Sequence, residues 1–154
     1  MRILYSNIIG EAEKELIILH GFLGMGDNWK TLSKKCASVG FRVHLIDQRN
    51  HGDSFHNNEF NYEIIANDLK YYVNHHDLTK FSLIGHSMGG KAAMTFGFLF
   101  PSYIDKLIIV DISPREYQPH HNAILASLNS IDFSVDNSRG KVDKKLTDLI
   151  PELG

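Results

Sequence analysis

A serine between two glycines is the pattern in this sequence that could do chemistry. Ser87 lies in the segment FSLIGHSMGGKAA, residues 81–93, where an apolar run passes into a helical pattern through G-x-S-x-G. A serine on such a sharp strand-to-helix turn projects its Oγ clear of the sheet, because the glycines relieve crowding. The dipole and free N–H groups of the following helix favour a developing oxyanion. We therefore predict Ser87 as a nucleophile and the N–H of Met88 as an oxyanion donor.

The same segment also contains most of a phosphate-binding loop. Gly85, Gly90 and Lys91 have the G-x-x-x-x-G-K spacing, but the next residue is Ala92. A phosphate-binding loop needs Ser or Thr there to coordinate magnesium, so nucleotide binding is not expected and Lys91 is interpreted as an exposed helix residue.

A second donor is expected on a loop that follows an earlier strand. The sequence LHGFLG, residues 19–24, occupies that place, and its glycines let the backbone approach a ligand closely. An ordinary glycine-containing turn is the alternative interpretation. Because the loop occurs together with the serine turn, we predict the N–H of Phe22 as the second oxyanion donor.

Short apolar runs alternate with helical patterns along the chain, which predicts an α/β fold with a mostly parallel sheet. The expected strands are residues 2–5, 16–19, 42–46, 81–84 and 107–110, and the expected helices are residues 28–37, 62–74 and 88–100. After residue 111 the sequence has no strand pattern, and weaker amphipathic pieces at 122–128 and 141–150 indicate a helical excursion out of the sheet.

Composition excludes several kinds of partner. The 154 residues carry 16 Lys and Arg against 18 Asp and Glu, so no basic field would hold nucleic acid or an anionic membrane. No apolar stretch approaches the roughly 20 residues that span a bilayer, and the N-terminus lacks a signal-peptide pattern. A single cysteine, Cys36, cannot form an internal disulfide, and we expect a cytoplasmic protein.

Four segments together resemble a known family. They are LHGFLGMGDNW, IDQRNHGDS, LIGHSMGGKAAM and LIIVDISPREY, in that order along the chain. They are similar to the α/β-hydrolase superfamily, and within it to the YbfF-like bacterial esterases and their mitochondrial relatives. The resemblance implies an α/β-hydrolase core begun by residues 1–115 and a helical cap begun by residues 116–154.

The resemblance also implies an activity and further site residues. It implies a serine carboxylic-ester hydrolase that acts on short-chain acyl esters or acyl thioesters in two steps and needs no cofactor. Asp111, at the end of its strand, would be the acid of the catalytic triad, although many such enzymes place the acid one strand later and Asp111 would then only cap the turn. Asp47 and Arg49 would brace loops.

The chain lacks an evident general base. In hydrolases of this type the order is serine, acid, then histidine, and the resemblance places that histidine on a loop after the last strand. The histidines that follow Asp111 are His120 and His121, which match the variable segment after the strand. We therefore expect a chain truncated before the catalytic histidine, with a sheet incomplete on its C-terminal side.

Two alternative functions are also considered. The chain could be an inactive fragment or an interaction piece, whose strand at 107–110 would present an open apolar edge that invites self-association. Hydrolysis of a carbon–carbon bond is a further chemistry open to this superfamily. Metal binding is not expected, because the histidine pairs at 75–76 and 120–121 are adjacent in sequence and no carboxylate spacing completes a site.

Overall fold

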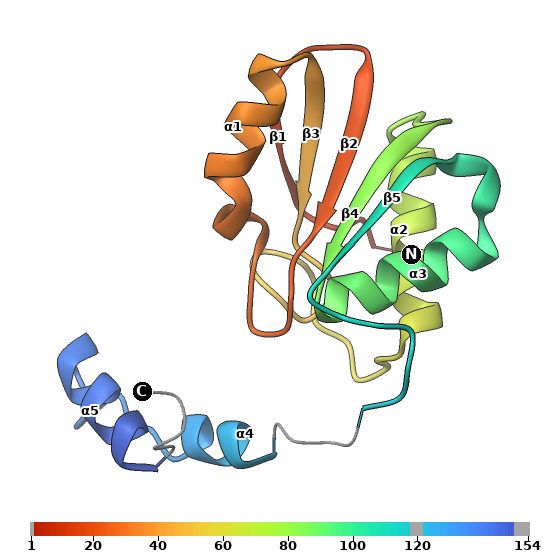
Figure 1. Cartoon of the computed structure of the whole chain (residues 1–154). Helices are drawn as coiled ribbons and strands as arrows, with labels where there is room; N and C mark the ends of the chain where they lie inside the picture. Colours follow the sequence, from red (N-terminus) through yellow and green to blue (C-terminus); the bar gives the residue numbers. More distant parts are fainter. Residues whose placement is uncertain (1, 118–121, 150–154) are drawn as a thin grey trace. The chain divides into compact units, whose positions relative to one another are not determined.

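The computed structural model describes residues 2–117 and 122–149, which belong to two compact units, Met1–Pro114 and Arg115–Gly154. The first unit contains a five-stranded sheet and three α-helices, and the second contains two further helices (Figure 1). Every predicted site residue lies in the first unit.

Four strands of the sheet run parallel and one edge strand runs against them. The strands are β1 (Ser6–Ile9), β2 (Lys14–Leu19), β3 (Phe41–Ile46), β4 (Phe81–His86) and β5 (Ile104–Val110). Their order is β1-β3-β2-β4-β5, and β1 is antiparallel to β3. The predicted mostly parallel sheet is confirmed. Because parallel strands end at the same edge of a sheet, the residues that follow β2, β4 and β5 come together there.

The strand expected at residues 2–5 is wrong, because the first strand begins at Ser6. Tyr5 instead bonds to the loop after β3: its N–H donates to Ser54 Oγ at 2.9 Å and its carbonyl accepts from the Asp47 N–H at 3.0 Å. Apolar residues occur both before and after position 6. The apolar pattern alone therefore could not show which of the two segments pairs with β3.

The sheet is covered on both faces because its apolar side chains alternate. On β2, Ile17 and Leu19 pack with α2 (Tyr62–His75) and α3 (Met88–Leu99), whereas Leu16 and Ile18 pack on the other face. That other face also contacts α1 (Lys30–Ser38), which follows the short 3₁₀ helix η1 (Gly26–Trp29). Figure 1 shows α1 on one side of the strands and α2 and α3 on the other. A second 3₁₀ helix, η2 (Pro101–Tyr103), joins α3 to β5.

Helix α3 approaches the sheet closely through glycines. A Cβ atom at Gly89 would lie 2.5 Å from the carbonyl oxygens of both Leu19 and His20, and one at Gly85 would lie 2.3 Å from the Gly89 carbonyl oxygen. Real Cβ atoms do not make such contacts. The first turn of α3 can therefore sit on the ends of β2 and β4 only if these positions remain glycine.

A buried polar network lies inside the first unit, away from the ends of the parallel strands that carry the predicted site. His44 is fully buried, with Nδ1 2.7 Å from the Tyr72 hydroxyl and Nε2 2.9 Å from Glu15 Oε2. The Tyr72 hydroxyl also lies 2.7 Å from Ser6 Oγ, and Arg42 lies 3.4 Å from Glu15. The network joins β1, β2 and β3 to α2, so its protonation state affects how these elements pack.

The second unit contains the helices α4 (Asn122–Asn129) and α5 (Arg139–Leu149). They confirm the amphipathic pieces expected in this region, apart from residue 150, which lies outside the described residues. Lys145, in α5, bonds to the segment between the two helices. Its Nζ donates to Asp136 Oδ2 at 2.8 Å and to the Ser130 carbonyl at 2.9 Å.

We predict that His44 makes the stability of this fold depend on pH. Burial, with smaller contributions from Arg42 and His76, lowers the pKa of His44 to about 4, below the ordinary value near 6.5. The unfolded chain therefore binds the proton first, and stability is lost as the pH falls from about 6.5 towards 4, by up to about 3 kcal/mol. Burial raises the pKa of Glu15, which opposes this slope above about pH 4.5.

Urea denaturation at pH 7 and at pH 4.5 measures the effect. A His44→Gln variant should lose much of the pH dependence, whereas His75→Gln, at an exposed position of the same helix that carries Tyr72, should retain it. An unchanged slope in His44→Gln would contradict the assignment.

We also predict that Gly89→Ala destabilises the first unit by at least about 2 kcal/mol, because the new methyl group meets two backbone carbonyls. Gly97→Ala in the same helix is the matched control. Its Cβ would lie 3.3 Å from the movable end of the Leu107 side chain, so a change of less than about 1 kcal/mol is expected. Thermal or urea unfolding of both variants checks this, and equal losses would show that close packing at Gly89 is not the cause.

Candidate active site

Ser87 occupies the turn between β4 and α3 in a rare backbone conformation. Its φ is 51° and its ψ is −115°, so it is one of the described non-glycine residues with positive φ. The Ser87 N–H donates to the Val110 carbonyl at 3.0 Å, and the Ser87 carbonyl accepts from the N–H groups of Gly90 and Lys91 at 2.9 and 3.2 Å. Hydrogen bonds on both sides of the residue thus maintain a strained turn, as is common where a side chain must be presented for chemistry.

The predicted donor loop lies directly against this turn. A Cβ atom at Gly21 would lie 3.3 Å from Ser87 Cβ and 2.8 Å from His86 Nδ1. Phe22 therefore follows a glycine whose backbone lies close to the side chains of His86 and Ser87. Met88 is the first residue of α3, and the first N–H groups of a helix have no acceptor within it. The structure brings Ser87, Phe22 and Met88 together at one edge of the sheet.

A cavity of about 330 Å³ lies beside the donor loop. Its lining includes Phe22, Gly21, Trp29 and His86, so it combines two aromatic side chains with the backbone of the loop. The ring centroids of His86 and Trp29 are 5.8 Å apart. The cavity is large enough for a small organic group, and His86, which precedes the predicted nucleophile, lines it.

Asp111 follows β5 in the position that corresponds to Ser87 after β4. His86 and Val110 are register partners in these two strands, so the residues that follow them leave the sheet side by side. Asp111 has a φ of 56°, its side chain is 83% exposed, and its Oδ2 lies 3.8 Å from His86 Nε2. The site therefore contains an accessible carboxylate beside the serine turn.

Sequence reasoning missed the pairing of His86 with Asp111. From the sequence alone, His86 is expected only to flank Ser87 on the turn and to point away from its Oγ. Strand register is the signal that could have revealed it, because His86 and Val110 end neighbouring parallel strands and Asp111 follows at once.

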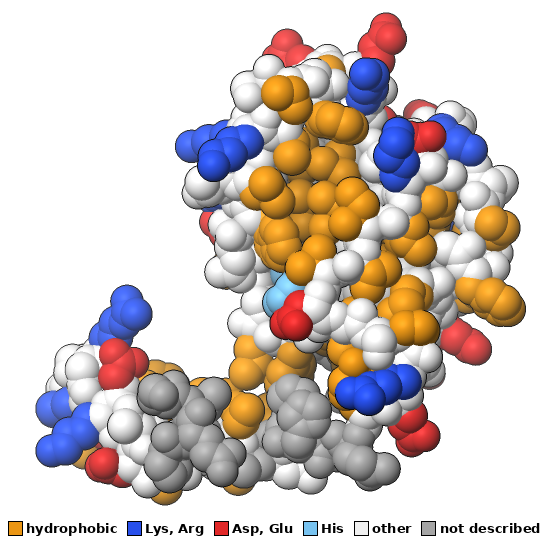
Figure 2. All heavy atoms as spheres, viewed as in Figure 1, with side chains coloured by type: hydrophobic (Ala, Val, Ile, Leu, Met, Phe, Trp, Pro, Cys, Tyr) orange, Lys and Arg blue, Asp and Glu red, His pale blue; other side chains and the backbone are white. Residues whose placement is uncertain are grey.

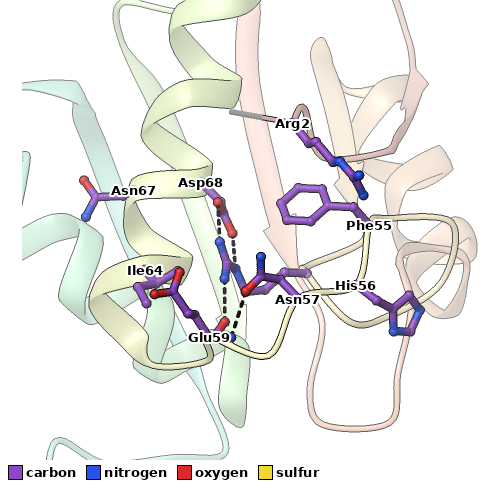
Figure 3. A pocket seen from close by; sticks show the side chains of 9 residues that line it. Arg2, Phe55, His56, Asn57, Glu59, Ile64, Asn67 and Asp68 are labelled. Atoms are coloured by element: carbon purple, nitrogen blue, oxygen red, sulfur yellow. Dashed lines mark hydrogen bonds and ion pairs between the residues drawn. The ribbon is translucent and has the colours of Figure 1, made fainter.

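Arg49 and Asp68 form a buried ion pair in a different part of the first unit. The Arg49 guanidinium donates through Nε and Nη2 to both carboxylate oxygens of Asp68, and Nη1 donates to the Glu59 carbonyl at 2.5 Å. The hydrogen bonds that Arg49 donates to Asp68 raise the pKa of Arg49 above its ordinary value. Arg49, Glu59 and Asp68 line a cavity of about 630 Å³, which Phe55 also lines (Figure 3). The paired charges brace the loop after β3 against α2, the role that the sequence predicts for Arg49.

Asp47 braces the same loop through the backbone. It is 2% exposed, and its two carboxylate oxygens accept from the N–H groups of Gly26 at 2.7 Å and Asp53 at 2.9 Å. A Cβ atom at Gly52 would lie 2.0 Å from the Asp47 carboxylate, and Gly52 has a φ of 51°. Asp47 is thus occupied by structural contacts, as predicted.

Within residues 2–117 and 122–149, no group of three or more histidine, cysteine, aspartate or glutamate side chains could hold a metal ion. In the same residues, no helix combines the length and apolar character needed to cross a membrane. His120 and His121 lie outside the described residues.

The sequence model for the alpha/beta hydrolase fold matches residues 15–136. The chain is 35% identical, over 97% of its length, to the sn-1-specific diacylglycerol lipase ABHD11 of Mus musculus, of which it covers 52%. It is 38% identical, over 88% of its length, to ethanol acetyltransferase 1 of Kluyveromyces lactis, of which it covers 37%.

A solved structure described as a marine microorganism esterase matches with a TM-score of 0.91 and 39% identity, over 98% of this chain and 60% of that one. The chain spans between 37% and 60% of the length of these proteins. The sheet order, the strained serine turn and the match over residues 15–136 confirm the expected fold, and the chain belongs to the α/β-hydrolase fold family.

Proposed function

We propose that this chain carries the nucleophile, acid and oxyanion donors of a serine carboxylic-ester hydrolase of the YbfF-like bacterial esterase group. The observation that carries the proposal is the strained Ser87 turn, which lies against the Gly21–Phe22 loop and beside Asp111. The words esterase and lipase in the names of two similar proteins support ester substrates. The single cysteine, Cys36, supports a cytoplasmic location.

The reaction would proceed by two acyl transfers. Ser87 Oγ attacks the carbonyl carbon of a short-chain acyl ester or thioester while its proton passes to a histidine base, and the N–H groups of Phe22 and Met88 donate to the oxyanion. The tetrahedral intermediate then collapses, and the alcohol or thiol leaves with the proton from the base. Water, deprotonated by the same base, releases the acid and regenerates Ser87. Asp111 orients the imidazole and stabilises its charged form.

We infer that the base comes from the part of the family fold that this chain does not match. The high exposure of Asp111 supports this, because an 83% exposed carboxylate is open to an approaching imidazole. We also propose residues 116–154 as the beginning of a helical cap. By itself the chain would then be an inactive fragment or an interaction piece. Carbon–carbon hydrolysis is the alternative reaction, and it would use the same nucleophile on another substrate.

Free imidazole tests the missing base. The chain alone should hydrolyse a short-chain chromogenic ester very slowly, and millimolar imidazole should accelerate hydrolysis more than it does with Ser87→Ala, because it can accept the Ser87 proton in place of the histidine. Ser102→Ala, at an exposed serine in η2, is the control and should respond like the parent chain. Rapid Ser87-dependent turnover without imidazole would show that a histidine of this chain is the base.

We propose self-association through β5 as a second property. β5 pairs with β4 on one side, and no strand of the described residues pairs with its other side. Leu107 and Ile108 on this strand are 39% and 45% exposed. Figure 2 shows hydrophobic side chains gathered over the sheet between α1 and α3, on the face where α1 lies. An open edge with apolar neighbours is a template for pairing with a second copy of the chain.

Analytical ultracentrifugation tests this property. The parent chain should form dimers or larger species as its concentration rises, and Ile108→Lys should shift it towards monomer because edge lysines oppose pairing. Phe98→Lys removes a similar apolar group from α3, where Phe98 is 84% exposed, and should leave association unchanged. A monomeric parent chain at all concentrations would refute self-association.

A further inference from the structure

His20 is a buried histidine with both ring nitrogens engaged. It is 1% exposed, with Nδ1 2.8 Å from the Gly21 carbonyl oxygen and Nε2 3.1 Å from the Gln48 backbone nitrogen. A carbonyl oxygen only accepts and a backbone N–H only donates. Nδ1 must therefore carry the hydrogen and Nε2 must be bare, so these two contacts select one neutral tautomer.

The Gly21 carbonyl is held by a second donor as well. The Gly24 N–H donates to it at 3.0 Å, and Leu23 supplies the positive φ of 59° in this turn. The Gly21 carbonyl and the Phe22 N–H belong to the same planar trans peptide, in which the two groups point in opposite directions. Fixing the carbonyl of Gly21 thus fixes the direction of the Phe22 N–H.

His20 is in turn tied to the end of β3 and to α3. Gln48 is 0% exposed, and its Nε2 donates to the His20 carbonyl at 2.7 Å while its own N–H donates to the ring. Gly89 packs against the same His20 carbonyl. Through its ring and its backbone carbonyl, His20 therefore contacts the donor loop, the segment after β3 and the helix that begins at the serine turn.

We infer that His20 is a positioning residue that holds the Gly21–Phe22 peptide so that the Phe22 N–H serves as an oxyanion donor. The inference rests on the proposed esterase function. His20 must stay neutral for this role, because a proton on Nε2 would face the Gln48 N–H. The charged and titratable groups that act on the ring are Asp47 and His51, and the ring centroid of His51 lies 5.0 Å from that of His20. Burial lowers the pKa of His20, which keeps the ring neutral at physiological pH.

Two substitutions separate positioning from bulk packing. Asn at position 20 places an amide nitrogen as many bonds from Cα as Nδ1, so His20→Asn retains a donor for the Gly21 carbonyl. His20→Ala removes it. In imidazole-assisted ester hydrolysis, His20→Ala should lower kcat by about 10- to 100-fold with KM nearly unchanged, and His20→Asn should recover most of that loss. His51→Asn is the control for removing a neighbouring histidine and should retain activity.

Nuclear magnetic resonance makes the inference independent of turnover. The His20 ring nitrogens of the parent chain should show the Nδ1–H tautomer from pH 6 to 8. The Phe22 amide resonance should shift in His20→Ala and lie near its parent position in His20→Asn. An Nε2–H or charged ring, or an unchanged Phe22 amide in His20→Ala, would overturn the inference. Absence of Ser87-dependent hydrolysis with these signals present would instead count against the proposed function.

Discussion

The hydrogen bond from the Ser87 N–H to the Val110 carbonyl is the contact on which the candidate site depends. Ser87 has a φ of 51°, a backbone conformation that a side chain makes costly, and it persists only because neighbouring groups determine it. The bond ties the turn to the end of β5, where Asp111 begins. The same contact therefore sets the backbone of the predicted nucleophile and the starting point of the predicted acid.

Close backbone approach is the second condition of the site. The glycines at 21, 85 and 89 lie where any Cβ would meet backbone or a ring, so loop, strand end and helix start are in direct contact. The surrounding polar groups satisfy one another: Asp47 accepts two backbone N–H groups, and Arg49 pairs with Asp68. These buried contacts brace the loop after β3 and occupy the charges of Asp47 and Arg49, so both side chains have structural roles.

The sequence predicted the parallel sheet and the place of Ser87, but it did not predict the first strand or the contacts between distant segments. Alternating apolar runs were sufficient for the parallel sheet, and the G-x-S-x-G spacing was sufficient to place Ser87 between β4 and α3. Periodicity failed at the N-terminus, where residues 2–5 and Ser6–Ile9 are similarly apolar and only pairing with β3 distinguishes them. The role of His20 and the contact between His86 and Asp111 depend on strand register and on which ring nitrogen meets which group. Such relations lie between segments distant in sequence, so no local pattern encodes them.

The position of β5 at the edge of the sheet has a consequence for how long the candidate site persists. Edge strands open more often than central ones because one of their sides makes no ladder bonds. When the end of β5 opens, the Val110 carbonyl leaves the Ser87 N–H, and the turn loses one of the bonds that holds its costly conformation. The conformation of the predicted nucleophile therefore persists only as long as the end of β5 stays paired, and anything that pairs with β5 also lengthens the time for which Ser87 is held in that conformation.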